Sequence, residues 1–189
     1  MHLLRRLPAV AALLALAAAL APSAHAAGQQ PPAAATTIVI VRHAEKGDGG
    51  DPRDPSLSAA GQARAAALAA ALDAAEVSAV YATQYKRTRE TGEPLAKRFK
   101  VEVGVRPVTA DNAAKYADQV VKEVLDKHAG KTVVVVGHSN TVLDFIEALG
   151  ARPPAPLGEN DYDRLFIVVR PASGPARLIQ ARYGAPDPR

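Results

Sequence analysis

Two runs of β-branched residues constrain the fold of this chain more than any other feature. Thr36–Val41 (TTIVIV) and Thr132–Val136 (TVVVV) are almost wholly apolar and show no alternation between apolar and polar positions. A strand with one face in water alternates, whereas a strand covered on both faces does not. Both runs are therefore predicted to be buried strands of a sheet with helices on either side.

The rest of the chain alternates between helical and extended patterns. The predicted helices are Leu57–Ala75, Thr88–Phe99, Asn112–His128 and Thr141–Leu149, and the other predicted strands are Ala79–Ala82, Val101–Val105, Leu165–Val169 and Ala176–Tyr183. Ser58 is a plausible N-cap, Pro94 is expected near the start of its helix or at a bend, and Gly130 is expected to close the third helix. The last two strands flank a Pro- and Gly-containing segment, which favours an antiparallel hairpin. This order predicts an α/β fold, a three-layer α/β/α sandwich whose mostly parallel central sheet has a C-terminal antiparallel hairpin.

The first 26 residues have the layout of a secretory signal. Arg5 and Arg6 give a basic start, a Leu- and Ala-rich run follows, and Ala24-His25-Ala26 supplies the small residues at which signal peptidase cuts. The apolar run is shorter than the roughly 20 residues of a bilayer span, so cleavage after Ala26 is favoured over an uncleaved anchor. Residues 27–35 are predicted to be a disordered lead-in and residues 36–189 one domain. We expect a periplasmic or secreted protein without a stable membrane anchor.

Composition excludes several kinds of chemistry. The chain has no cysteine, which excludes thiol nucleophiles and thiolate metal sites. Arg5 and Arg6 supply part of the excess of 23 basic over 19 acidic residues, and aromatic residues make up only 4% of the chain. This composition gives little support to nucleic-acid binding and fits a small anionic substrate better. The abundance of Ala and Pro suggests a bacterial source.

The two central runs end in histidines. Arg42 and His43 follow the first run, and Gly137-His138 follows the second. Ligands of open α/β sheets bind outside the carboxyl ends of the strands, so both imidazoles are expected at the same end of the sheet. If the two strands are neighbours, the imidazoles can approach one another.

Histidines and arginines in this arrangement suit phosphoryl transfer. A neutral imidazole can attack phosphorus and form a phosphohistidine. The transferred group spreads charge over its oxygens, and guanidinium groups match its geometry. Arg87, at the carboxyl end of the second predicted strand, can point into the same crevice, while Lys86 and Arg89 are expected to face solvent.

Four segments then resemble the histidine phosphatase superfamily, the phosphoglycerate-mutase-like proteins. The segments are VRHAEK, LSAAGQARA, YATQYKRTRETGEPLA and VVVVGHSNTV, and they occur in that family's order over nearly all of residues 36–189. The compact middle of the chain is similar to the small phosphohistidine-phosphatase type. The resemblance implies a phosphatase acting on a small phosphorylated substrate, without a metal or another cofactor.

The resemblance also implies roles for individual residues. His43 matches the nucleophile, Arg42 and Arg87 the phosphate-binding arginines, and His138 the second pocket histidine. Thr83 falls where the family has a Ser, which implies a role in binding phosphate or substrate, and Thr91 matches a Thr within the following helix. The chain departs from the family pattern at Ala44, Gln62 and Ser139. Ser139 has a hydroxyl that could touch substrate, although a helix N-cap is its favoured role.

The general acid is the open position. Asp111 is the best-placed carboxylate after the third predicted strand, but a helix cap is favoured for it. Glu45 is the other candidate, and a surface salt bridge with Lys46 or Arg53 is its alternative. Small family members that cleave activated phosphoramidates can dispense with a strong acid.

Three further segments are predicted to be structural. Gly47–Asp51 is expected to be a mobile loop, His128 the end of a helix, and residues 160–163 a plain turn, although that turn could reach the pocket rim. Two alternatives to the phosphatase remain. One is a metallohydrolase with His43, Glu45 and His138 as ligands, and the other is a non-catalytic phosphate-binding module of the same fold.

Overall fold

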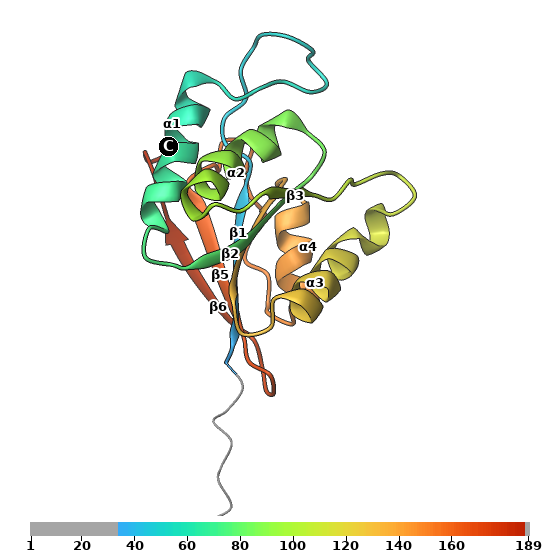
Figure 1. Cartoon of the computed structure of the whole chain (residues 1–189). Helices are drawn as coiled ribbons and strands as arrows, with labels where there is room; N and C mark the ends of the chain where they lie inside the picture. The colour runs from blue at the N-terminus through green and yellow to red at the C-terminus, as the bar shows by residue number, and fades with distance from the viewer. Residues whose placement is uncertain (1–33, 188–189) are drawn as a thin grey trace, which may run out of the picture. The chain divides into compact units, whose positions relative to one another are not determined.

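A central sheet of six strands organises residues 34–187, the part of the chain that the computed structural model describes. The strand order is β3-β2-β4-β1-β5-β6 (Figure 1). The strands are β1 (Thr36–Arg42), β2 (Val77–Ala82), β3 (Val103–Val105), β4 (Thr132–Gly137), β5 (Arg164–Arg170) and β6 (Arg177–Arg182). Neighbours among β1 to β4 are parallel, whereas β5 is antiparallel to β1 and to β6. The predicted mostly parallel sheet with a C-terminal hairpin at its edge is confirmed.

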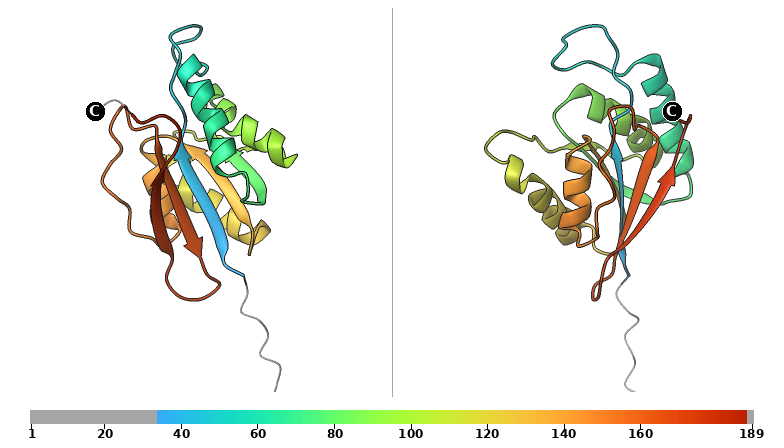
Figure 2. Two further views of the ribbon diagram at one scale, coloured as in Figure 1. Left: turned by 90° about the vertical axis from the view of Figure 1, so that its left-hand side faces the viewer. Right: turned by 180° about the vertical axis from the view of Figure 1, so that it is seen from behind.

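Helices cover both faces of this sheet. On one side lie α1 (Ala59–Ala71) and α2 (Lys86–Phe99), and on the other lie α3 (Tyr116–Lys127) and α4 (Thr141–Ala148) (Figures 1 and 2). Side chains of a strand alternate between faces. Accordingly, Val39 and Val41 of β1 join the core beneath α1 and α2, while Ile38 and Ile40 join the core beneath α3 and α4. Burial on both faces explains why β1 and β4 lack polar alternation.

Several element boundaries differ from the predictions. The third helix begins at Tyr116 rather than at Asn112, because a 3₁₀ turn over Ala113–Lys115 precedes it. Strand β3 has only three residues at the sheet edge. Because α2 begins at Lys86, Pro94 lies inside the helix rather than near its start. Such shifts are expected, since helix ends are set by local hydrogen bonds that the hydrophobic pattern does not encode.

The start of α1 is fixed against the loop that follows β1. The Ser58 side chain accepts a hydrogen bond from the Gly61 N–H at 3.1 Å, which confirms its role as the N-cap. The Ser58 N–H in turn donates to the carbonyl of Glu45 at 2.9 Å. A Cβ at position 61 would collide with that same carbonyl oxygen, so glycine is required there. This contact brings α1 close to the residues that follow His43.

The predicted signal, residues 1–26, and most of the predicted lead-in lie outside the described residues. Ala34 and Ala35 have no regular secondary structure, and the first strand begins at Thr36, where the sequence predicts that strand to begin. Within residues 34–187, none of the helices has the length and apolar character needed to cross a bilayer.

Candidate active site

The pairing of β1 with β4 brings the two histidines together. Arg42 is in register with Gly137, and the His43 N–H donates to the Gly137 carbonyl at 2.9 Å. The chain leaves both strands at the same edge, where the ring centroids of His43 and His138 are 5.4 Å apart. The expectation that the two imidazoles meet at the carboxyl ends of neighbouring strands is confirmed.

His43 is held in one orientation. Its Nδ1 lies 2.8 Å from the Ala44 carbonyl oxygen, which can only accept, so Nδ1 carries the proton. The Nε2 lone pair is then free for attack on an electrophile. The next residue is fixed as well, since the Ala44 N–H donates to the Thr91 hydroxyl at 2.9 Å. Ala44 is fully buried, and among the described non-glycine residues only Glu76 and Lys100 have a positive φ, so alanine fits at this position.

Both imidazoles are neutral at neutral pH. Burial is the main cause that lowers the pKa of His43 to about 3; the nearby His138, Arg42 and Arg87 act in the same direction, and the Ala44 hydrogen bond opposes them. Burial likewise lowers the pKa of His138 to about 4, with Arg87 and Arg42 acting in the same direction. Desolvation and neighbouring cations disfavour the imidazolium form. His43 is therefore an available nucleophile across the physiological range.

His138 is positioned by a chain of hydroxyl groups. Its Nε2 lies 3.1 Å from the Thr83 hydroxyl, which is 2.8 Å from the Thr88 hydroxyl. The Thr88 hydroxyl donates to the Tyr85 carbonyl at 2.8 Å. Thr83 and Thr88 are fully buried, so this series of hydroxyl groups fixes the orientation of the His138 ring from the protein interior. Thr83, for which the sequence predicts a substrate-binding role, orients His138 in this structure.

Arg42 is caged by backbone oxygens and an aromatic ring. The side chain is buried, and its NH1 donates to the carbonyls of Gly158 at 2.9 Å and Glu159 at 2.7 Å. The Tyr162 ring lies 4.3 Å from the guanidinium carbon. The Arg42 Nε is buried and has no hydrogen-bond partner among the described residues. A buried donor without a partner is costly, which is expected where a ligand completes the site.

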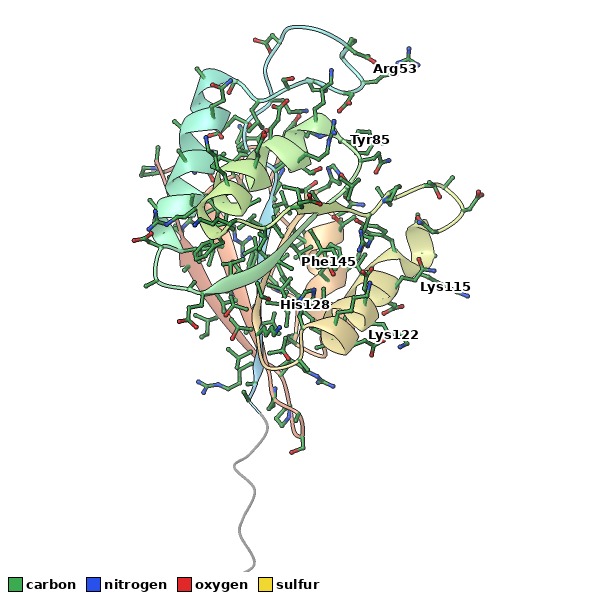
Figure 3. All side chains as sticks on the ribbon, viewed as in Figure 1. Arg53, Tyr85, Lys115, Lys122, His128 and Phe145 are labelled. Carbon is green, nitrogen blue, oxygen red and sulfur yellow. The ribbon has the colours of Figure 1, made fainter. Side chains whose placement is uncertain are left out.

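Arg87 provides the second cation. It lies in the first turn of α2, and its guanidinium carbon is 4.4 Å from the Tyr85 ring. Its Nε is also buried without a partner in the described part of the chain. The Tyr85 ring meets the His138 ring at a centroid distance of 5.4 Å. Figure 3 shows Tyr85 at the end of the molecule that carries Arg53, away from His128. Two guanidinium groups and two neutral imidazoles thus converge on one place.

Neither predicted acid faces the histidines. Glu45 pairs with the buried Arg64, with Oε1 2.7 Å from NH2, rather than with Lys46 or Arg53 as expected. Arg53 instead lies 3.8 Å from Asp51. The predicted surface salt bridge of Glu45 with Lys46 or Arg53 is wrong, because the side chain turns toward α1 and pairs with Arg64.

Asp111 and Ser139 also differ from expectation. Asp111 is exposed in a turn before the 3₁₀ segment, whose N-cap position is taken by Asn112, so Asp111 does not cap a helix. The N-cap of α4 is Asn140 rather than Ser139, and neither cap side chain makes a capping hydrogen bond. Ser139 is half-buried beside His138.

The sequence prediction missed two tyrosines. Tyr85 and Tyr162 each stack on one arginine and approach one histidine, Tyr162 lying 6.2 Å from His43 between ring centroids. Tyr162 also lines a hollow of about 370 Å³ beside the loop at residues 45–49. Residues 160–163 are therefore more than a plain turn. The clues in the sequence are only that Tyr85 precedes Arg87 and that Tyr162 lies in a polar turn.

His128 has the structural role predicted for it. It is the C-cap residue of α3, and its Nε2 lies 3.2 Å from the Tyr81 hydroxyl. Lys86 and Arg89 are exposed, as expected. Within residues 34–187, no three His, Asp or Glu side chains gather as a group that could hold a metal. Glu45 is turned toward Arg64, so the set His43, Glu45 and His138 does not form the alternative metal site.

Comparisons with known proteins agree with this geometry. Residues 38–112 match the model of the histidine phosphatase superfamily, branch 1. No curated protein sequence matches the chain. Among solved structures, the native mycobacterial glucosyl-3-phosphoglycerate phosphatase has a TM-score of 0.60 at 18% identity, covering 76% of this chain and 97% of its own. The putative phosphohistidine phosphatase SixA from Nakamurella multipartitia has a TM-score of 0.55 at 24% identity, covering 82% and 99%.

A third structure, the protein histidine phosphatase SixA complexed with tungstate, has a TM-score of 0.60 at 15% identity over 77% of this chain and 96% of its own. At these identities the structural likeness establishes the fold. Residues 38–112, less than half of the chain, also match the family model, so this part of the sequence is similar to the histidine phosphatase superfamily, branch 1.

Proposed function

We propose that the protein hydrolyses a phosphate monoester or phosphoramidate through a phosphohistidine on His43. The proposal rests on a neutral His43, whose Nδ1 is bound to the Ala44 carbonyl and whose Nε2 is free. Near it lie the guanidinium groups of Arg42 and Arg87, whose buried Nε atoms have no partner among the described residues. Neutral imidazole is the reactive form of histidine as a nucleophile.

The reaction runs in two displacements. His43 Nε2 attacks phosphorus, an N–P bond forms, and the bond to the leaving group breaks with its electron pair on the leaving group. Water then attacks the phosphohistidine, the N–P bond breaks and phosphate leaves, which restores neutral His43. Arg42 and Arg87 offset the charge on the phosphoryl oxygens, and His138 hydrogen-bonds to them as charge develops.

The surroundings of His138 favour substrates with a good leaving group. Only burial and the two arginines shift the pKa of His138, and both candidate carboxylates turn elsewhere. A leaving group that departs without a proton from the protein suits this site, such as an aryl oxide, or neutral imidazole released from a phosphoimidazole that is protonated on its other nitrogen. We expect kcat/KM to be highest for phosphoimidazole and aryl phosphates and lowest for glycerol phosphate. Equal values across this series would exclude the preference.

The function is tested with residues 27–189 and a panel of phosphoesters and phosphoramidates. We expect the wild type to hydrolyse p-nitrophenyl phosphate in the presence of EDTA and the His43→Ala variant to be inactive while remaining folded by circular dichroism. Wild-type rates in His43→Ala would contradict the mechanism. Full loss of phosphatase activity in EDTA would favour the metallohydrolase. Tight phosphate binding without hydrolysis of any substrate in the panel would favour the non-catalytic binding module.

We also propose that the protein acts in the periplasm or outside the cell, on a small phosphorylated substrate. The support is the N-terminal sequence, with its basic start, apolar run and Ala-His-Ala ending at residue 26. Cell fractionation followed by intact-mass measurement is expected to find a chain that begins at Ala27 in the exported fraction. A full-length chain in the cytoplasmic fraction would contradict export.

A further inference from the structure

The C-terminal segment, residues 183–187, is joined to the active-site loop by the buried Arg64 of α1. Arg64 is 4% exposed. Its Nε and NH2 donate to the Glu45 carboxylate at 2.9 and 2.7 Å, and its NH1 donates to the carbonyls of Tyr183 at 3.1 Å and Ala185 at 2.9 Å. The remaining NH2 hydrogen reaches Asp187 at 3.2 Å. All five donors of the guanidinium are therefore used.

Asp187 connects Arg64 to a second segment, the backbone at Tyr162 and Asp163. Its side chain is 8% exposed, and Oδ1 receives the hydrogen bond from Arg64. Oδ2 accepts from the backbone N–H of Tyr162 at 2.8 Å and of Asp163 at 3.0 Å. Hydrogen bonds to an ionised carboxylate are about twice as strong as neutral ones, so this side chain holds the backbone at residues 162 and 163 firmly.

The backbone held by Asp187 adjoins the residues that surround Arg42, and the two sets share Tyr162. Residues 158–162 precede β5 and are called the 158–162 turn below. Its carbonyls at Gly158 and Glu159 accept from Arg42 NH1, and its Tyr162 ring stacks on the guanidinium. With NH1 committed to the turn, Arg42 keeps Nε, which has no partner among the described residues, for an anion. The orientation of Arg42 therefore depends on where the turn lies.

We propose that Asp187 is a positioning residue of the phosphate site. Its carboxylate fixes the 158–162 turn, and the turn aims the Arg42 guanidinium at the phosphoryl group. The inference rests on the proposed function, because it assumes that Arg42 binds phosphate.

A purely structural role for Asp187 is less well supported. The end of the β5–β6 hairpin is already held independently of it. The Asp163 carbonyl accepts from the Tyr183 N–H at 2.9 Å, and the Asp163 carboxylate lies 2.5 Å from Arg182 NH1. Asp187 also contacts Asp163, but it adds the links to the Tyr162 N–H and to Arg64, and both of these lead to the residues around His43.

The test is inhibition of wild type and Asp187→Asn by orthovanadate, a phosphate analogue. An asparagine amide must point its NH2 either at the Tyr162 N–H or at Arg64, and both are donors. We expect the inhibition constant to rise by about tenfold, because a buried charge-assisted contact is lost. The matched control is Glu123→Gln in α3, which breaks the ion pair of that carboxylate with Arg106, and its inhibition constant is expected to match that of the wild type.

Two further variants keep the result decisive. Asp187→Glu retains the charge but displaces the carboxylate, so a smaller rise in the inhibition constant is expected. This variant provides the test if Asp187→Asn does not fold. In a background of Arg42→Lys, Asp187→Asn is expected to add nothing, because its effect passes through Arg42. A structural role would instead lower the melting temperature and the active fraction while leaving vanadate inhibition of the folded enzyme unchanged.

Different outcomes would refute the positioning role of Asp187 and the proposed phosphatase function. Unchanged vanadate inhibition in both folded Asp187 variants, or fully additive effects with Arg42→Lys, would overturn the positioning role alone. If vanadate and inorganic phosphate do not bind the wild type, the proposed function itself fails.

Discussion

The site consists of two halves that contain the same residue types, but the side chains of the two halves are fixed by different hydrogen-bond partners. One half, at the end of β1, contains His43, Arg42 and Tyr162, and the other contains His138, Arg87 and Tyr85. In each half a tyrosine ring stacks on an arginine, at 4.3 Å for Arg42 and 4.4 Å for Arg87.

The anchoring of the two halves is unequal. Arg42 donates to backbone carbonyls, and His43 is 4% exposed with its neighbour Ala44 bound to Thr91. His138 is half-buried and is held through hydroxyl groups. A nucleophile must meet phosphorus at a fixed angle, whereas a group that stabilises charge tolerates more freedom. The difference indicates that the β1 half performs the covalent step and the other half assists it.

The largest expected effect is the fall in kcat when either site histidine is replaced, and it is expected to differ between the two histidines. His43→Ala is expected to lower kcat by at least about 10³-fold, because the covalent route is lost. His138→Ala is expected to lower it by about 10²-fold, because a hydrogen bond to the transition state is lost while the nucleophile remains. Steady-state rates with p-nitrophenyl phosphate measure both. The assignment of roles would be reversed if His138→Ala were the more damaging change.

The two arginines are expected to differ in the same direction. Arg42→Lys cannot satisfy the turn carbonyls and the phosphate together, so kcat/KM is expected to fall by about 10²-fold. Arg87→Lys, which has no backbone cage to disturb among the described residues, is expected to cost about tenfold. The comparison uses kcat/KM at low ionic strength. Equal losses would show that the cage around Arg42 has no catalytic consequence.

A smaller effect is expected at the supporting threonines. Thr91→Val leaves the buried Ala44 N–H without its acceptor and is expected to lower the free energy of unfolding by about 1–3 kcal/mol. Thr83→Val removes a partner of His138, whose ring is half-exposed and can bond to water, so about 1 kcal/mol is expected. Urea titrations of both variants measure the difference. A larger loss in Thr83→Val would contradict the view that the His43 half is the more firmly built.

A further prediction is a dependence of stability on pH. Both site histidines have a lowered pKa in the folded protein, about 3 for His43 and about 4 for His138, against an ordinary 6.5. The unfolded chain therefore binds more protons below pH 6.5, so stability is full above that pH and is lost as pH falls toward the folded values. Each histidine contributes a slope of up to about 1.4 kcal/mol per pH unit.

Urea titrations between pH 7 and 5 measure this slope. We expect it to be shallower in His43→Ala and His138→Ala than in the wild type. His128, whose pKa burial also lowers, contributes to the remaining slope, and His128→Ala serves as a control outside the site. An unchanged slope in both site variants would show that the histidines are not buried in their neutral form.

The fold and the histidine pair could be predicted because their signals are local. The unbroken apolar runs of β1 and β4 require cover on both faces, and each run ends in its functional residue. Once the strands are parallel neighbours, the meeting of His43 and His138 follows. Boundaries were less predictable, since the 3₁₀ turn before α3 depends on local hydrogen bonds.

The contacts around the pair could not be predicted because they join distant parts of the chain. The cage of Arg42 comes from residues 158–162, and the tie from Asp187 comes from the other end of the domain. Glu45 illustrates the difficulty. Its neighbours Lys46 and Arg53 were the expected partners, but its actual partner, Arg64, sits in an Ala-rich helix where an arginine usually faces water.

The most direct test of the account is rapid chemical quenching of a single turnover, followed by mass spectrometry of the peptide that contains His43. The account predicts a phosphoryl group on the His43 imidazole that forms before free phosphate appears and is absent from His43→Ala. A phosphoryl group on any other residue, or one that persists in His43→Ala, would contradict it.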